Sequence, residues 1–427
     1  MKQRSCPKAL SLFSFSVGSL IAAILIGFLL LSCVYALPTA RMRRNVKDSL
    51  PYIQNENDFY FWAPYHNSTA LDGFTDSIML GNAIYESSAS PFHDALVNPR
   101  MEFTPGDTVP VDSLAKYASG ETDGREVTYA RYWHGYLLLL KPLLLFFSPA
   151  DIRLLNMTVQ LLLGALVLLL AYKKAGCGLA LSLGAAMICL NPISTALCLQ
   201  YTDVYLLTLI FEAILLHFRT DRKQFGCLLF LWLGIAIAYF DFLTYPLVSL
   251  GILLVTELAL CRETLTGKLK RMLLDSSAWA IGYGGMWAGK WVLATVFSEQ
   301  NVIQNALQSV RERTSATVDA ASISPLLVLK RNIQVYVNPS AELLFLLLLF
   351  GLLYLLIIKK RAPRLHAVSI VPLVLCAAYP VIWTLLLSNH AMIHSHMTYR
   401  NFAISVMAIG CMIDSCFPRE APEKLES

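Results

Sequence analysis

The chain has 427 residues, of which 56% are hydrophobic and only 15% are charged. Soluble globular proteins carry about 25% charged residues. This composition therefore excludes a cytosolic enzyme, a nucleic-acid binder and a secreted domain held together by disulfides. Several apolar runs reach or approach the ~20 residues that a helix needs to cross a bilayer. We expect an all-α, polytopic membrane protein.

About ten membrane-spanning helices are predicted from the apolar runs and the breaks between them. They are expected near residues 11–36, 154–172, 178–197, 202–218, 225–240, 243–260, 273–297, 341–358, 366–388 and 400–417. The short loops after the second, fourth, sixth and eighth spans are rich in Lys and Arg, whereas the short loops between them carry none. Because cytoplasmic loops carry the excess of Lys and Arg, both termini are predicted to be cytoplasmic, in a multi-pass plasma-membrane protein.

The first apolar run is expected to remain as a transmembrane helix. A cleaved signal peptide is the alternative, because Val34-Tyr35-Ala36 resembles a cleavage site. The run is longer than the apolar region of a signal peptide, which favours the uncleaved helix. The resulting organisation has six parts: 1–37 (tail and first span), 38–153 (large first extracytoplasmic loop), 154–297 (spans two to seven), 298–340 (extracytoplasmic amphipathic loop), 341–417 (spans eight to ten) and 418–427 (cytoplasmic tail).

The large first loop is expected to fold as a small cap, since a structureless loop of that length is uncommon in a compact protein. Within it, the stretch 71–80 contains two carboxylates four residues apart, Asp72 and Asp76, followed by apolar residues. On a short helix these two side chains would share one face. Two close carboxylates raise each other's pKa, which suits a general base. The alternative for Asp72 is a helix cap.

An aromatic stretch, Tyr129 to Tyr136, ends the loop and includes Trp133 and His134. It fits an aromatic belt at the membrane–water interface, and it equally suits a site for a sugar or an isoprenoid. The stretch alone does not decide between these two roles. We expect Trp133 and His134 to be substrate-binding residues.

Polar residues at the outer ends of the later spans are further candidates, because charges in a membrane are costly and usually face a cavity. Asp203 begins the fourth span and Asp241 lies in the turn between the fifth and sixth, although both could simply cap helices. Lys290 lies about two turns below the outer end of the seventh span. It is expected to hold an anion, with snorkelling to the interface as the alternative.

A histidine cluster lies between the last two spans, with His390, His394 and His396 followed by Tyr399 and Arg400. The first two histidines are four residues apart and would share a helix face, which is a plausible metal-ligand spacing. No Asp or Glu lies nearby in the sequence, so hydrogen bonding to a polar ligand and a structural role are the competing interpretations. We expect no protein-bound metal there, while a requirement for Mg²⁺ or Mn²⁺ is left open.

Two other features of the sequence narrow the function. The chain has no nucleotide-binding or zinc-protease motif, so ATP-driven transport and a cytosolic nucleotide-sugar fold lack support. An apolar set at Val302, Ile303, Ala306, Leu307 and Val310 has helical spacing and predicts an amphipathic helix on the outer surface. Arg311 and Arg313 at its end could contact a phosphate or simply face water.

The arrangement of one span, a large first outer loop with Asp72 and Asp76, and many later spans with outer polar groups resembles the GT-C superfamily of multispan glycosyltransferases. Three stretches, 132–135, 240–246 and 398–401, are also similar to bacterial glucosyltransferase-like membrane proteins. The resemblance implies a GT-C-like bundle, a polyprenyl-phosphate-linked sugar as donor and a catalytic acidic residue in the first loop, which Asp72 or Asp76 matches. Here the two acidic residues are four apart rather than adjacent, so the choice between them stays open.

The function implied is transfer of a sugar from a polyprenyl-phosphate donor to a glycan or lipid acceptor of the cell envelope. Asp76 or Asp72 would take the proton of the acceptor hydroxyl. The residues expected to bind the donor and its phosphate are Lys290, Arg400, His394, His390 and Tyr399, and those expected to bind substrate are His134, Trp133, Asp241 and Asp203. The alternatives are a flippase for lipid-linked sugars and a non-catalytic subunit of an envelope-assembly complex.

Overall fold

The computed structural model describes residues 6–87, 89–103, 109–218, 223–336 and 366–417, together with 346, 347, 350, 351 and 354. Within this part of the chain the fold is mostly helical, and its strands form three separate two-stranded antiparallel sheets. The span predicted near 341–358 lies almost wholly outside these residues, as do the basic residues 219, 222 and 359–364 and the tail 418–427.

The segment between the first helix and the main bundle folds as a compact cap with its own hydrophobic core. Its elements are α2 (Ala40–Glu56), β1 (Phe59–Phe61), η1 (Asn67–Thr69), β2 (Ala70–Asp72), α3 (Gly73–Ile84), α4 (Pro91–Val97), β3 (Pro99–Glu102), α5 (Pro110–Ser119), β4 (Arg125–Thr128) and α6 (Leu137–Leu144). Strand β1 pairs with β2, and β3 with β4. Residues of α2, α3 and α5 pack in one core with the end of the first helix.

Local sequence signals fix the helix ends of the cap. The Ser90 side chain accepts a hydrogen bond from the backbone of His93, and Pro91 occupies the first turn of α4. Asn98 ends α4 and Gly120 ends α5, both in the left-handed conformation that terminates a helix.

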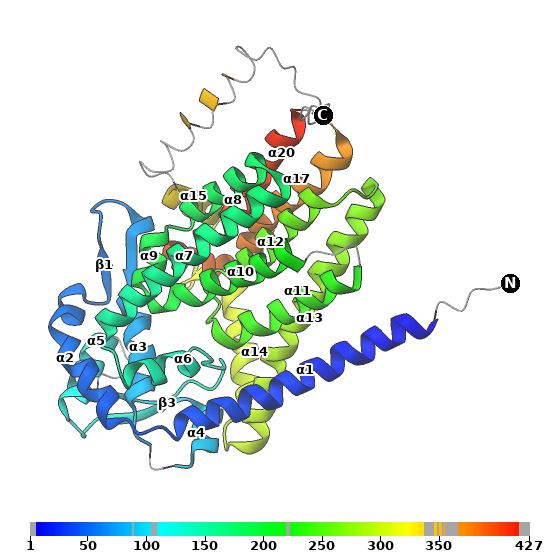
Figure 1. Ribbon diagram of the computed structural model, residues 1–427. Coiled ribbons are helices and arrows are strands. Elements are labelled where there is room, and N and C mark those ends of the chain that lie inside the picture. Colours follow the sequence, from blue (N-terminus) through cyan, green and yellow to red (C-terminus); the bar gives the residue numbers. More distant parts are fainter. Residues whose placement is uncertain are drawn as a thin grey trace, which may run out of the picture.

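The second part of the fold is a bundle of mostly apolar helices with a larger core. It contains α1 (Cys6–Tyr35), α7 (Pro149–Ala175), α8 (Cys177–Cys189), α9 (Pro192–Leu197), α10 (Leu199–Phe218), α11 (Lys223–Phe240), α12 (Leu247–Leu260), α13 (Leu265–Phe297), α17 (Ala367–Leu386) and α20 (Ala403–Cys416). In Figure 1, α1 runs along one side of the bundle and its C-terminal end meets the cap.

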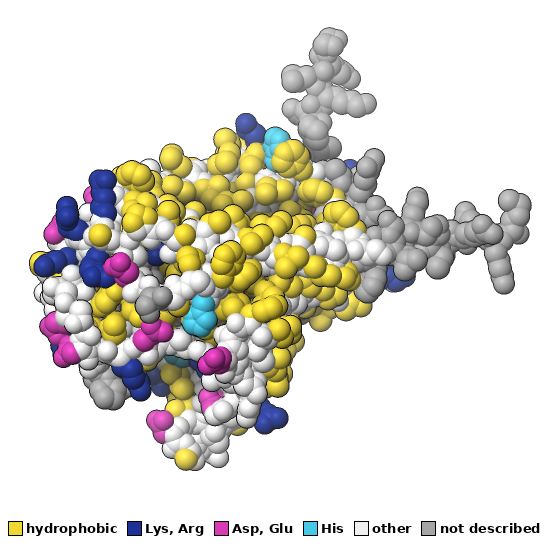
Figure 2. All heavy atoms as spheres, turned by 90° about the horizontal axis from the view of Figure 1, so that it is seen from below, with side chains coloured by type: hydrophobic (Ala, Val, Ile, Leu, Met, Phe, Trp, Pro, Cys, Tyr) yellow, Lys and Arg dark blue, Asp and Glu magenta, His cyan; other side chains and the backbone are white. Residues whose placement is uncertain are grey.

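Four helices among the described residues are long and apolar enough to cross a membrane: Ser14–Tyr35, Pro149–Ala175, Leu199–Phe218 and Ala367–Leu386. Three shorter apolar helices accompany them: Cys177–Cys189, Phe225–Phe240 and Leu247–Leu260. The chain thus has the helices of a membrane protein, and the number of ten spans stays a prediction. Figure 2 shows hydrophobic side chains over much of the bundle, while Lys, Arg, Asp and Glu gather at the end formed by the cap.

The segment 178–197 was predicted as one span, and the structure corrects this to two helices. Helix α8 ends at Cys189, Asn191 adopts a left-handed conformation (φ 58°), and Pro192 begins α9. Pro has no backbone N–H and its ring clashes with the preceding turn, so it starts a helix but does not continue one. Two other helices begin later than predicted, at Leu247 and Ala403.

Helices α11 and α13 pack with their backbones in close approach. A Cβ added at Gly234 would lie 2.2 Å from the carbonyl oxygen of Trp279, and one at Gly282 would lie 2.2 Å from that of Leu231. Small residues that allow such close approach are typical of helix pairs in membranes.

The remaining elements cover the end of the bundle next to the cap. They are α14 (Val302–Arg313), β5 (Thr317–Val318), β6 (Ala321–Ser322), α15 (Pro325–Tyr336), α18 (Ser388–Ile393), α19 (Ser395–Thr398) and η3 (Tyr399–Phe402). The helix predicted from the spacing of Val302 to Val310 is confirmed as α14. Val302 and Ala306 are buried, whereas Ile303, Leu307 and Val310 remain exposed.

Candidate functional site

Asp72 and Asp76 lie at the start of α3, where β2 passes directly into the helix. Asp72 is the N-cap residue, and its Oδ1 accepts a hydrogen bond from the backbone N–H of Thr75 (2.9 Å). Asp76 lies in the first turn. The predicted short helix is therefore confirmed, and both carboxylates are buried, with 2% and 5% of their surface exposed.

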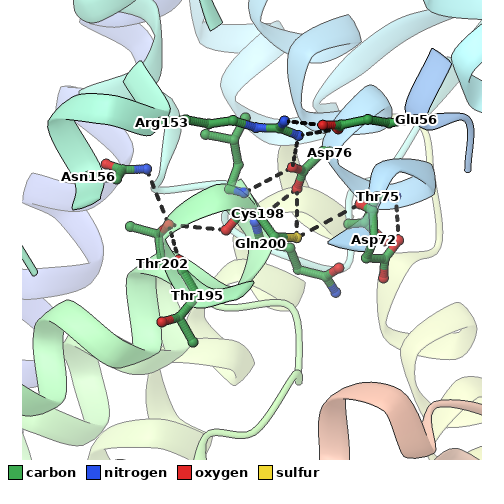
Figure 3. A network of polar contacts seen from close by, with 11 residues as sticks. Glu56, Asp72, Thr75, Asp76, Arg153, Asn156, Thr195, Cys198, Gln200 and Thr202 are labelled. Atoms are coloured by element: carbon green, nitrogen blue, oxygen red, sulfur yellow. Dashed lines mark hydrogen bonds and ion pairs between the residues drawn. The ribbon is translucent and has the colours of Figure 1, made fainter. Parts of the chain in front are cut away.

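The Asp76 carboxylate caps the N-terminus of α10 (Figure 3). Oδ2 accepts from the backbone N–H of Leu199 and Oδ1 from that of Gln200, both at 3.0 Å, and the Cys198 thiol lies 3.3 Å from Oδ1. Burial raises the pKa of Asp76 to about 6, opposed by Arg153 and these two N–H groups. An anion is favoured at this position because the free N–H groups and the dipole of a helix N-terminus attract negative charge.

Arg153 and Glu56 complete the surroundings of Asp76. The guanidinium forms two parallel 2.8 Å bonds to the Glu56 carboxylate, and its Nη2 lies 4.0 Å from Asp76 Oδ2. Sequence reasoning missed this pair, because the two residues lie 97 positions apart and neither belongs to a recognisable motif. It links α2 of the cap to α7 of the bundle.

Asp72 contacts the histidine cluster. Its Oδ2 lies 3.5 Å from Nε2 of His396, whose side chain is 17% exposed, and the His396 ring packs edge-on against Phe59 at 5.3 Å. The Asp72 carboxylate is therefore buried, and the His396 imidazole that it contacts is partly exposed at the surface. The two residues are 324 positions apart, and the spacing of neighbouring residues in the sequence gives no signal for such a contact.

The three imidazoles form a row. The ring centroids of His396 and His394 are 6.1 Å apart, and those of His394 and His390 are 4.8 Å apart. His390 Nδ1 accepts from Arg313 (2.6 Å), which leaves its Nε2–H to donate to the carbonyl of Leu243 (2.8 Å). Leu243 itself has a positive φ of 70°, an uncommon conformation for a bulky residue.

Burial keeps the inner imidazoles of this row neutral. Burial, with His396 and Arg313 nearby, lowers the pKa of His394 to about 4, while Asp72 opposes the shift. The pKa of His390 lies well below its usual value, because of burial and then the neighbouring His394 and Arg313. His394 is thus within electrostatic reach of both Asp72 and Arg313.

Beyond Arg313 lies a cavity of about 560 Å³, which we call the tryptophan chamber. Its walls come from the segment before α6 and from α13, α14 and α17, and include Arg131, Tyr132, Tyr283, Trp287, Trp291, Arg313 and Trp383. Three buried polar atoms of its lining residues, Arg131 Nε, Tyr283 Oη and Trp287 Nε1, have no hydrogen-bond partner among the described residues. The chamber therefore combines an apolar, aromatic wall with two guanidinium groups.

Lys290 and the aromatic stretch make contacts within the protein. Lys290 Nζ donates to the carbonyl of Ala95 (2.7 Å) and to Asn98 Oδ1 (2.8 Å) at the end of α4. The Trp133 indole donates to the carbonyl of Met286 (2.8 Å). These bonds tie the cap to α13.

His134 is similarly enclosed. Its Nδ1 lies 3.0 Å from the Tyr136 hydroxyl and its Nε2 lies 2.9 Å from the carbonyl of Tyr129. Burial, with the charge of Lys290 next, holds the pKa of His134 well below its usual value, so the ring is neutral.

Asp241 closes the turn that leads into α12. Its carboxylate accepts from the backbone N–H groups of Leu243 and Thr244 and from the Thr244 hydroxyl. Burial raises the pKa of Asp241 to about 6, against these hydrogen bonds. Asp203 is half-buried near the N-terminal end of α10, just past its first turn.

Arg400 and Tyr399 lie next to the histidine row and make hydrogen bonds to backbone carbonyls. Arg400 is fully buried, donates to the carbonyls of Leu190 (3.0 Å) and His396 (2.8 Å), and lies 4.0 Å from the centre of the Tyr201 ring. The Tyr399 hydroxyl donates to the carbonyl of Ser68 in the cap.

Of the residues expected to form the site, the structure brings Asp72, His394 and His390 into one row. His396 lies between Asp72 and His394, and Arg313 lies beside His390. It places Lys290, Trp133 and His134 in a separate set of contacts at α4 and α13. Across the described ranges, no three His, Cys, Asp or Glu side chains converge so that they could hold a metal ion. No protein-family model, curated protein or solved structure matches this chain.

Proposed function

We propose that the protein is an integral membrane glycosyltransferase that uses a polyprenyl-phosphate-linked sugar at the extracytoplasmic face. The acceptor is a glycan or lipid of the cell envelope. The observation that carries the proposal is the contact between Asp72 and His396, at one end of a histidine row whose other end meets Arg313 and the tryptophan chamber.

The Asp72–His396 pair is the general base in this proposal. With Nε2–H donated to Asp72, the imidazole carries its lone pair on Nδ1, and the carboxylate stabilises the imidazolium that forms. Nδ1 takes the proton of the acceptor hydroxyl as its oxygen attacks the anomeric carbon of the donor. The bond from that carbon to the phosphate oxygen breaks, and polyprenyl phosphate leaves with one more negative charge.

The other end of the row suits the donor. An isoprenoid chain is apolar and fits between the aromatic side chains of the tryptophan chamber, while Arg313 and Arg131 offset the charge of its phosphate. Charge stabilisation of this kind acts on the leaving group as the transition state forms. Asp76, whose two oxygens already accept backbone hydrogen bonds, serves the fold in this proposal.

The test uses purified protein in liposomes with a panel of polyprenyl-phosphate sugars and candidate acceptors, with and without Mg²⁺ or Mn²⁺. Mass spectrometry follows the release of free polyprenyl phosphate from wild type, Asp72→Asn and His396→Asn. His217→Asn is the matched control, because His217 is an exposed imidazole in the last turn of α10.

We expect release by wild type and by the control, and a loss of at least about 100-fold in both site variants at unchanged thermal stability. If both variants still release polyprenyl phosphate, the Asp72–His396 pair is not the general base. If wild type releases nothing from any donor but moves a labelled lipid-linked sugar across the bilayer, the protein is a flippase instead.

A further inference from the structure

The pairing of β1 with β2 places two phenylalanines on the same face as Asp72. Phe59 is the direct partner of Asp72, and Phe61 is the direct partner of Ala70. Directly opposed residues of an antiparallel pair project from the same face, and residues two apart on a strand do so as well. We call this side of the two strands the aromatic face. Tyr60, between the two phenylalanines, projects from the opposite side.

The aromatic face is open and touches the proposed general base. Phe59 is 48% exposed and Phe61 is 40% exposed. The Phe59 ring stands at 79° to the ring of His396, with their centres 5.3 Å apart. A ligand that packs against these rings therefore lies directly beside the Asp72–His396 pair, at the end of the histidine row away from the tryptophan chamber.

We propose that the aromatic face binds a pyranose ring of the acceptor, so that the acceptor is a carbohydrate; this rests on the proposed function. The C–H groups on one side of a pyranose form an apolar face that packs on an aromatic ring, whose surface is electron-rich. The hydroxyl groups at the edge of the stacked sugar then point along the strands toward His396. A lipid alcohol has no such flat face and gains little from two rings in this position.

The two ends of the histidine row also differ in charge, and this difference supports the same assignment of donor and acceptor. Two guanidinium groups belong to the tryptophan chamber, which suits the phosphate of a donor. Phe59 and Phe61 carry no charge, which suits a neutral sugar. The donor and the acceptor thus approach the histidine row from opposite ends, and the glycosidic bond forms between them.

The test measures binding without turnover, in full-length protein held in nanodiscs. The probes are methyl β-D-glucopyranoside and its 2-acetamido analogue, whose axial hydrogens H1, H3 and H5 lie on one face of the ring. Saturation-transfer NMR reports which hydrogens contact the protein. We expect the strongest transfer to those three hydrogens, and about tenfold weaker binding in Phe61→Ala, the effect of losing one stacked ring.

Two variants serve as controls. Phe61→Trp keeps a ring in place and retains binding, and Tyr60→Ala removes an equally exposed ring (41%) from the opposite side and also retains it. Absence of transfer to both probes in wild type, or an equal effect of Phe61→Ala and Tyr60→Ala, would overturn the proposal. Unchanged sugar binding in Phe61→Ala would also overturn the proposal, and it would assign the Phe59 and Phe61 rings to the membrane–water interface.

The readouts keep this proposal and the proposed function apart. Sugar binding that depends on Phe61, together with no release of polyprenyl phosphate from any donor, refutes the transferase and leaves a carbohydrate-binding face. Release that proceeds in Phe61→Ala with the wild-type KM for the acceptor and the wild-type kcat refutes the aromatic face and leaves the transferase.

Discussion

Replacing Asp76 with Asn tests whether this carboxylate holds the cap on the bundle. Each of its oxygens accepts one backbone N–H, from Leu199 and from Gln200. Asn keeps one oxygen but turns an NH₂ group toward the second donor, which then has no partner in a buried place. A buried donor left without a partner costs about 1–3 kcal/mol. We therefore expect the free energy of unfolding to fall by about this amount and Tm to fall by a few degrees.

Thermal unfolding in detergent micelles measures the fall in Tm, and Asp48→Asn is the control, since Asp48 is exposed on α2. A second readout is the labelling of Cys198 by a thiol reagent, identified on its peptide by mass spectrometry. The Cys198 thiol is buried against Asp76, so loosening this junction should speed its labelling.

One combined result would refute the reasoning. An Asp76→Asn protein that melts at the wild-type temperature, with Cys198 labelled at the wild-type rate, would mean that the carboxylate does not hold α10. If that protein had also lost sugar transfer, Asp76 and not Asp72 would be the general base.

Three further predictions follow from contacts described above. Lys290→Met leaves two buried acceptors at the end of α4 without their donor, so unfolding free energy measured in micelles should fall by about 2–5 kcal/mol while binding of lipid phosphate is unchanged. Gly282→Ala should lower Tm by forcing α13 away from α11, whereas Gly284→Ala, which meets nothing within 4 Å, should not. The pKa of His394 is about 4 in the fold and 6.5 ordinarily, so the unfolded chain binds the proton more readily between these values. Stability present above pH 6.5 should therefore be lost as the pH falls to 4, by up to about 3 kcal/mol, and His394→Gln should show a smaller loss in a pH series of melts.

The sequence predicted those features that depend on neighbouring residues. The helix after Asp72 and the amphipathic helix from Val302 both follow from short-range spacing, and both are confirmed. The break at Asn191-Pro192 also had a local signal, since Pro favours the first turn of a helix. One span was nevertheless predicted over 178–197 because the apolar run is continuous, and hydropathy alone does not distinguish one long helix from two short ones.

The candidate site could be predicted only in part, because its decisive contacts join residues far apart in the chain. Asp72 and the histidines were each conspicuous, but nothing local indicates that Asp72 meets His396 rather than His394. A charged residue near a helix end looks the same in a sequence whether it caps a helix, ties two segments together or faces a ligand. Lys290 is the clearest example, since its partner Asn98 lies 192 positions earlier.

The junction between the cap and the bundle has a consequence for biosynthesis. The cap residues Trp62, Ser68 and Asp76 are held by residues at 191–200, which lie 122 to 132 positions later in the chain. During synthesis the cap must therefore emerge before the segment after α8 has been made, and until then Asp76 lacks the two backbone N–H groups of Leu199 and Gln200. A chain that stalls before residue 200 would display a loose cap, and a membrane-associated protease could distinguish it from a finished molecule by that feature alone.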